Sequence, residues 1–260
     1  MSEPRRRQYL EAMGIQTWER RDAEAPAAVS EAEATPLPDA GADSAVLAPD
    51  APVEHAARSE TVQPSGQDDA SVQQLDWDAL AARVAGCTAC ELHRSRTQTV
   101  FGVGDRRADW MVIGEAPGAE EDRQGEPFVG RAGQLLNNML LAMGLKREQV
   151  YIANILKCRP PKNRDPRLEE VVCCEPYLAR QVDLLQPKII LAVGRIAAQN
   201  LLKTDSSLAR MRGRVFHYGE SRVPVVVTYH PAYLLRTPRD KRKAWEDLQF
   251  AMRVHAEGRE

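Results

Sequence analysis

The stretch Trp110-Met-Val-Ile-Gly-Glu-Ala-Pro-Gly118 places four apolar residues directly before a glycine-rich turn. Three more apolar runs end in a similar way: 150–153 before Asn154, 188–193 before Gly194, and 224–228 before Tyr229-His230. Helical patterns separate these runs, at residues 132–143, 168–185, 195–202 and 239–255. Near-continuous Val/Ile-rich strands that alternate with helices are typical of a parallel sheet covered on both faces. The sequence therefore predicts an α/β fold, a three-layer αβα domain with a central four-stranded parallel sheet.

The four strand ends also indicate where a ligand would bind. In open α/β sheets, ligands occupy the crevice outside the carboxyl ends of the strands. Polar residues and glycines gather at those ends, in Gly114–Gly118, at Asn154, at Gly194 and in His230-Pro231. We therefore expect four loops to converge on one crevice.

The net charge of the 260-residue chain is −2, from 35 Lys+Arg and 37 Asp+Glu, but it averages unlike parts. Residues 1–21 carry five Arg and three Glu, and residues 22–74 carry eleven acidic residues and one Arg. Residues 75–260 carry 29 basic and 23 acidic residues. The overall charge argues against a nucleic-acid partner, whereas the mildly basic body can bind one, with binding that weakens as salt rises.

The same parts predict the domain organisation. Residues 22–74 are rich in Ala, Pro and acidic residues and contain no aromatic residue, so we expect a disordered linker. Residues 1–21 are expected to form a short amphipathic segment, on the hydrophobic residues Tyr9, Leu10, Met13, Ile15 and Trp18. This segment is either a frayed terminus or a peptide that docks on a partner. Residues 75–260 form the predicted folded domain.

The boundary between linker and domain allows two interpretations. Gln73-Gln-Leu-Asp-Trp77 loosely resembles the short peptides by which bacterial repair proteins bind the sliding clamp. Such pentapeptides are degenerate, and the more common explanation is that Leu75 and Trp77 start the first core helix.

No apolar run approaches the roughly 20 residues that a membrane helix needs. The N-terminus has Arg5-Arg6-Arg7 but no apolar region with a cleavage site, so we expect no signal peptide. The sequence favours a monomeric cytoplasmic protein without a membrane partner.

The five cysteines suggest a metal centre. Cys87-Thr-Ala-Cys90 has the two-residue spacing that lets both sulfurs face one ion. Cys158 lies far from the adjacent Cys173 and Cys174, and this wide spacing argues against zinc and fits a cubane cluster held by four thiolates. Inert buried thiols would explain a lone cysteine but not the close first pair. Spacing alone leaves open whether Cys173 or Cys174 is the fourth ligand.

Three motifs in order resemble those of the bacterial-type iron–sulfur (family 4) uracil-DNA glycosylases. They are Gly114 to Asp122 with Gly125 to Leu136, then Asn154-Ile-Leu-Lys-Cys-Arg-Pro-Pro-Lys-Asn-Arg164, then His230-Pro-Ala-Tyr-Leu-Leu-Arg236. The resemblance covers about residues 75–252 and leaves an N-terminal extension. It implies a base-excision repair enzyme that flips uracil out of single- or double-stranded DNA, hydrolyses its N-glycosidic bond and leaves an abasic site. Such an enzyme is associated with the nucleoid while it is bound to DNA.

The resemblance also implies a [4Fe–4S] cluster on four of the cysteines, Cys87, Cys90, Cys158 and Cys174. Cys173 is then a packing residue. The cluster is expected to be structural, because hydrolysis transfers no electrons.

Several residues gain substrate roles from the resemblance. Phe128 would stack on uracil, although an aromatic residue can equally belong to the core. Asn154 would read uracil N3–H and O4, because an amide offers both an acceptor and a donor; without the resemblance it is a turn or cap residue. Glu121 would crowd C5 and exclude the methyl group of thymine. Ala116 and Asn163 would lie near the substrate.

The chemistry is assigned to a few groups. His230 would donate to uracil O2 and stabilise the departing anion. Glu115, with neighbouring carbonyl groups, would position the attacking water, because Ala116 occupies the place where other uracil glycosylases have Asp. No lysine in the motifs is an obvious Schiff-base nucleophile, so we expect a monofunctional enzyme without lyase activity.

A further set would contact DNA. The resemblance suggests phosphate contacts from Arg131, Arg159, Arg164 and Arg236, and from backbone N–H at Gly194. Tyr233-Leu234-Leu235 would form an apolar wedge that fills the space of the flipped base.

Two rival functions stay open. A DNA-binding relative that traps uracil sites covalently has an extra basic, His-containing loop, and no such insertion lies between Glu120 and Phe128. The second rival is a zinc-stabilised module that binds nucleic acid and has no catalytic activity.

Overall fold

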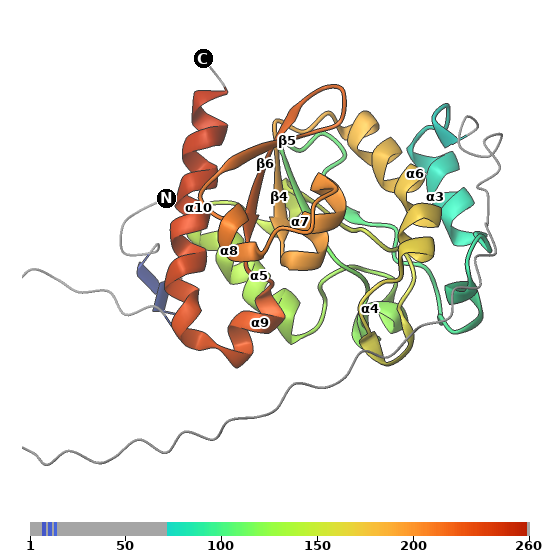
Figure 1. Ribbon diagram of the computed structural model, residues 1–260, viewed down its shortest axis with the longest axis horizontal. Helices are drawn as coiled ribbons and strands as arrows, with labels where there is room; N and C mark the ends of the chain where they lie inside the picture. The colour runs from blue at the N-terminus through green and yellow to red at the C-terminus, as the bar shows by residue number, and fades with distance from the viewer. Residues whose placement is uncertain (1–6, 9, 12, 15–71, 259–260) are drawn as a thin grey trace, which may run out of the picture. The chain divides into compact units, whose positions relative to one another are not determined.

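Within the described residues, six strands form one mixed sheet in the order β1-β3-β2-β4-β6-β5 (Figure 1). In this computed structural model the four central strands are parallel, and they coincide with the four predicted apolar runs: β3 (Tyr151–Asn154), β2 (Trp110–Gly114), β4 (Ile189–Val193) and β6 (Val223–Thr228). Every residue of β2, β3 and β4 is buried, which explains why these sequences are continuously apolar rather than alternating.

The α/β class and the central parallel sheet are confirmed, and the sheet extends at both edges by strands that the sequence did not predict. β1 (Val103–Gly104) pairs antiparallel with β3, and β5 (Val215–Tyr218) pairs antiparallel with β6. β1 has only two residues and β5 alternates between exposed and half-buried positions, so neither shows a continuous apolar run. Antiparallel edge strands on a parallel core are common in large sheets.

Helices cover both faces of the sheet, as predicted (Figure 1). One face packs against α5 (Arg131–Ala142), α9 (Pro231–Arg236) and α10 (Lys241–Glu257). The other packs against α6 (Leu168–Leu185) and α7 (Arg195–Leu202). The other helical elements are α3 (Trp77–Ala85), α4 (Ala119–Gln124), α8 (Leu208–Met211), η1 (Glu91–Arg94), η2 (Arg147–Gln149), η3 (Pro161–Asn163) and η4 (Pro238–Asp240). None of the helices in the described residues is long and apolar enough to cross a membrane.

The structure describes residues 7–8, 10–11, 13–14 and 72–258, so the predictions for nearly all of the 22–74 linker, and for Tyr9, Ile15 and Trp18, lie outside it. Met13 is fully buried, and Leu10 packs with it against the core face that α10 covers. These two apolar side chains are therefore occupied by the domain itself and are not presented to a partner.

The start of the domain supports the core-helix interpretation of Leu75 and Trp77. Asp76 caps α3, because its Oδ1 accepts hydrogen bonds from the N–H groups of Asp78 (3.1 Å) and Ala79 (2.9 Å). The ring of Trp77 lies 5.0 Å from the ring of Tyr151, centroid to centroid. The carbonyl oxygen of Leu75 accepts a 2.7 Å hydrogen bond from an arginine of α6.

Candidate active site

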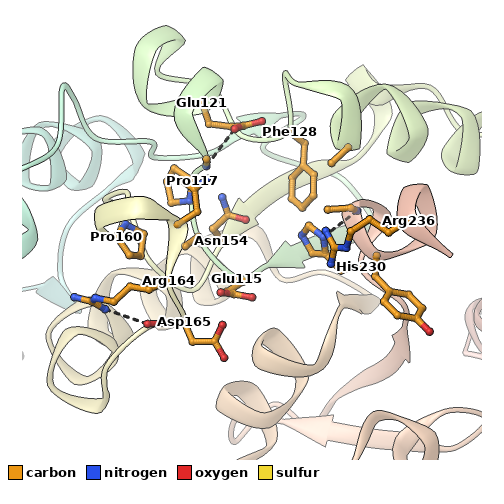
Figure 2. Close-up of a pocket in the computed structure, with 16 residues that line it drawn as sticks. Glu115, Pro117, Glu121, Phe128, Asn154, Pro160, Arg164, Asp165, His230 and Arg236 are labelled. Atoms are coloured by element: carbon orange, nitrogen blue, oxygen red, sulfur yellow. Dashed lines mark hydrogen bonds between the residues drawn. The ribbon is translucent and has the colours of Figure 1, made fainter.

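A cavity of about 420 Å³ opens at the carboxyl ends of the central strands (Figure 2). Ten predicted site residues line it: Glu115, Ala116, Glu121, Phe128, Asn154, Asn163, Arg164, His230, Tyr233 and Arg236. Six more lining residues had no predicted role: Pro117, Gly118, Ala132, Pro160, Asp165 and Ala232. Most of these six lie within the three quoted motifs, and Asp165 directly follows the second. The sheet topology therefore brings three distant motifs to one place.

Asn154 ends β3 with a buried side chain that points into the cavity (Figure 2). Its Oδ1 has no hydrogen-bond partner in the part of the chain that the structure describes. Gly114 makes room for it, because a Cβ at that position would overlap this oxygen and lie 2.6 Å from Cζ of Phe128. A buried acceptor without a partner costs free energy, so Oδ1 is a place for a ligand N–H.

Phe128 is held in a strained backbone conformation, with φ of +54°. Its carbonyl oxygen accepts a 3.2 Å hydrogen bond from Nη1 of Arg147. Gly133 lies so close to that carbonyl that any Cβ would overlap it. The ring packs with the core and also faces the cavity, 5.6 Å from the ring of His230. Strain that several contacts hold in place is typical of ligand sites.

The Glu121 carboxylate connects two loops of the cavity wall. Its Oε2 accepts the N–H of Gly118 (3.1 Å), and its Oε1 accepts the N–H groups of Val129 (3.0 Å) and Gly130 (3.1 Å). Hydrogen bonds to an ionised acceptor are stronger than neutral ones, so this side chain is fixed.

His230 has a defined tautomer. Its Nδ1 accepts a 3.1 Å hydrogen bond from the N–H of Ala232, so the proton of the neutral ring is on Nε2. Burial, with the nearby positive charge of Arg236 as the second cause, lowers the pKa of His230 to about 4. A cavity-lining Nε2–H donor without a positive charge is therefore present at neutral pH. Gly194 permits this placement, because a Cβ there would lie 2.9 Å from Cβ of His230.

Glu115 lies at the end of β2, on the cavity wall beside Asp165 (Figure 2). Burial, together with the negative charge of Asp165, raises the pKa of Glu115 to about 7, and the positive charge of Arg195 opposes both effects. A carboxyl with a pKa near neutrality can exchange a proton during a reaction.

Two of the predicted DNA contacts need correction. Leu234 is fully buried in the core, so its side chain cannot act as part of a wedge in this arrangement. The N–H of Gly194 donates a 2.8 Å hydrogen bond to the carbonyl of Thr228, so it is not offered to a phosphate. Leu235 remains exposed, and the Tyr233 ring stacks on Tyr229 at 5.2 Å. Sequence spacing could not tell which side of this short helix faces the core.

The predicted arginines divide into two groups. Arg164 and Arg236 line the cavity, whereas Arg131 and Arg159 lie outside its wall. Arg164 makes a two-fold ion pair with Glu170, at 2.9 Å (Nη1–Oε2) and 2.5 Å (Nη2–Oε1). Nε of Arg159 donates a 2.8 Å hydrogen bond to Oδ1 of Asn163, an interaction that the sequence did not suggest.

All five cysteines line a second, much smaller cavity, together with Arg96 and Lys157. No group of three or more His, Cys, Asp or Glu among the described residues is arranged to hold a single metal ion. A zinc ion needs its ligands about 2.0–2.3 Å from one point. The five thiols share one small cavity, although they come from segments far apart in the sequence.

Burial acts strongly on two thiols of this cavity. Burial raises the pKa of Cys174 to about 12 and that of Cys90 to about 11, so these thiols need a cation in order to ionise. Nη1 of Arg96 lies 3.0 Å from the sulfur of Cys158. The sulfur of Cys173 is instead 3.4 Å from the carbonyl oxygen of Ala89.

Lys157 lies between the two cavities, and the sequence gave it no structural role. Its side chain is fully buried, and its Nζ donates to the carbonyl of Asn154 (2.9 Å) and to Oε1 of Gln181 (2.6 Å). A lysine inside the apolar run before Cys158 was the available signal, because a buried lysine requires specific partners.

Residues 101–249 match the family model of the uracil DNA glycosylase superfamily. The chain is 43% identical over 178 residues to a type-4 uracil-DNA glycosylase of Archaeoglobus fulgidus, covering 66% of this chain and 89% of that protein. It is 40% identical over 177 residues to a type-4 uracil-DNA glycosylase of Thermotoga maritima, covering 67% and 92%. A type-5 uracil-DNA glycosylase of Pyrobaculum aerophilum is 33% identical over 193 residues, covering 61% and 83%.

Proposed function

This chain belongs to the uracil DNA glycosylase superfamily, among the type-4 enzymes, and we propose that its larger cavity binds a uracil base flipped out of DNA and releases it by hydrolysis. The chain is a uracil-DNA glycosylase, a hydrolase that acts in DNA repair on uracil-containing DNA. The main support for this proposal is the unpartnered, buried Oδ1 of Asn154, in a cavity wall that also contains the Phe128 ring and the His230 imidazole.

Base recognition follows from the amide of Asn154. Oδ1 accepts the N3–H of uracil, and the amide nitrogen donates to O4, a pattern that cytosine reverses. The ring of Phe128 stacks on the base, which offsets the few kcal/mol lost when the base leaves the helix. Glu121, fixed by its three backbone hydrogen bonds, stands against C5 and excludes the methyl group of thymine. Ala116 and Asn163 complete the substrate wall.

Bond cleavage uses a neutral donor and a carboxylate. Nε2–H of His230 donates to uracil O2 as negative charge develops on the leaving base. Glu115 positions the water that attacks C1′ of the sugar. No lysine lines the cavity within the described residues, which supports a monofunctional enzyme without lyase activity.

DNA would be held around the cavity mouth by cationic and apolar side chains. Arg131, Arg159, Arg164 and Arg236 contact phosphates, and Tyr233 and Leu235 occupy the space that the flipped base leaves. These contacts suit single- and double-stranded DNA, bound by a monomer. A repair enzyme works where the chromosome lies, which in a bacterium is the cytoplasm.

The smaller cavity would hold a [4Fe–4S] cluster on Cys87, Cys90, Cys158 and Cys174. The buried thiols and the Arg96 donor to the Cys158 sulfur support this ligand set. When bound, the cluster cross-links segments that lie far apart in the sequence and supplies no step of the hydrolysis. Cys173 is then a neighbour of the cluster, not a ligand.

The test uses the full chain with single- and double-stranded oligonucleotides that carry one uracil, and matched oligonucleotides that carry thymine. We expect release of free uracil and strand cleavage only after alkali, with no product from thymine. Strand cleavage before alkali would overturn the monofunctional assignment. A stable protein–DNA adduct without turnover would instead support the covalent-trapping relative.

A further inference from the structure

A second carboxylate lies on the cavity wall beside Glu115, and neither the motifs nor the mechanism above assigns it a role. Asp165 follows η3 and lines the cavity together with Glu115. Figure 2 shows the two carboxylates from different loops turned toward one another at the same side of the cavity. His230 stands on the opposite side of the cavity in this view (Figure 2).

Asp165 is held in this position from two directions. Its carboxylate forms a 3.2 Å ion pair with Nη2 of Arg195, the first residue of α7. Its carbonyl oxygen accepts a 3.0 Å hydrogen bond from Nη1 of Arg164. The Arg195 side chain is itself fixed, because its Nη1 donates a 2.9 Å hydrogen bond to Oε1 of Gln199. These contacts hold the Asp165 carboxylate on the cavity wall beside Glu115.

Two charged groups act on Glu115 besides its burial. The negative charge of Asp165 raises the pKa of Glu115, and the positive charge of Arg195 lowers it. The other charged cavity residues are engaged elsewhere, since Arg164 pairs with Glu170 and the Glu121 carboxylate binds backbone N–H groups. Arg236 acts instead on the His230 side of the cavity.

We propose that Asp165 is a positioning residue that makes Glu115 a stronger acceptor for a proton of the attacking water, with Arg195 as its counter-charge. This inference rests on the proposed function. The oxygen of the water forms a bond to C1′ while the C1′–N1 bond breaks, and its electron pair leaves on uracil. One proton of the water passes to the carboxylate of Glu115, which later returns it to solvent.

The opposite charges of Asp165 and Arg195 together set the basicity of the Glu115 carboxylate. A weakly basic carboxylate would accept the proton poorly, whereas one that is too basic would already be protonated at neutral pH. Asp165 supplies basicity, and Arg195 limits it. Because both charges act on one carboxyl, their removal must shift its titration in opposite directions.

The test measures single-turnover uracil release against pH at saturating enzyme and low ionic strength, where screening is weakest. Ionisation of Glu115 sets the acidic limb of this profile. We expect Asp165→Asn to move that limb to lower pH by about one unit, and Arg195→Gln to move it to higher pH. Glu115→Gln should lose most of the rate and the limb itself. Glu169→Gln, an exposed acid of the same segment that lies outside the cavity wall, should leave the profile unchanged.

The outcomes separate this inference from the proposed function. Both side chains of the ion pair are largely exposed, 51% for Arg195 and 68% for Asp165, so both variants are expected to fold, which thermal unfolding checks. Shifts in the same direction, or no shift in either variant, would overturn the role of Asp165 while uracil release by the wild type stands. Absence of uracil release by the wild type at every pH would overturn the function itself.

Discussion

The two cavities of this protein are lined by side chains of different chemistry, although Asn154 of one and Cys158 of the other are only four residues apart. The larger cavity holds side chains that keep a donor or acceptor for a ligand, such as Oδ1 of Asn154 and Nε2 of His230. The smaller is lined by thiols, and burial raises the pKa of two of them, Cys174 and Cys90. The difference reflects two tasks. Recognition of a base needs polar atoms without partners on a rigid frame, whereas metal binding needs thiols that come together from distant segments.

The cysteine cavity should dominate stability. Cys158→Ser removes one thiolate from the proposed cluster, and we expect loss of bound iron and a fall of more than about 4 kcal/mol in the free energy of unfolding. Iron analysis, visible absorption and chemical unfolding measure these effects. Cys173→Ser is the matched control and should keep its iron. Iron loss in the control with iron retention in Cys158→Ser would reverse the ligand assignment.

The larger cavity should dominate activity without affecting iron. Asn154→Ala and His230→Ala each remove a hydrogen bond to the base, and we expect single-turnover uracil release to fall about 10²–10³-fold. Asn200→Ala and His217→Ala remove the same side-chain types outside the cavity and should keep wild-type rates. Wild-type activity in both cavity variants would refute the site.

A substitution at Lys157 should affect both stability and activity, because this residue lies between the two cavities. Lys157→Met leaves the carbonyl of Asn154 and Oε1 of Gln181 without their buried donor, at about 1–3 kcal/mol for each group. We therefore expect lower stability together with slower uracil release, measured by thermal unfolding and single-turnover kinetics. Lys203→Met, which breaks a surface ion pair with Glu175, is the matched control. An unchanged rate in Lys157→Met would show that the two cavities work separately.

The smallest expected effect is a pH dependence of stability. The pKa of His230 is lowered from 6.5 to about 4, so the unfolded chain takes up a proton between these values while the folded chain does not. Stability from this group is complete above pH 6.5 and decreases as the pH falls toward 4. His230→Gln should therefore lose less stability than the wild type over this interval, measured by chemical unfolding at each pH. A parallel decline in both proteins would contradict the lowered pKa.

The sequence predicted the central strands well because a strand buried on both faces must be continuously apolar. It failed for β1 and β5, since short edge strands carry no such run. The place of the cavity was predicted because the ends of parallel strands meet at one edge of the sheet, whereas Glu121, Phe128 and Asn163 were assigned from the family resemblance. Leu234 was assigned to the wrong side because a six-residue helix has too little periodicity to identify its buried face. Asp165 was missed because its ion-pair partner Arg195 lies 30 residues away in the sequence.

The most direct measurement is a crystal structure of the full chain bound to DNA that carries one uracil, with a substitution at Glu115 to slow cleavage. We expect a flipped uracil stacked on Phe128, with N3–H donating to Oδ1 of Asn154 and O2 accepting from Nε2 of His230. The proposed site would be contradicted by a uracil bound elsewhere on the protein. It would also be contradicted by a uracil in the cavity that contacts neither Oδ1 of Asn154 nor Nε2 of His230.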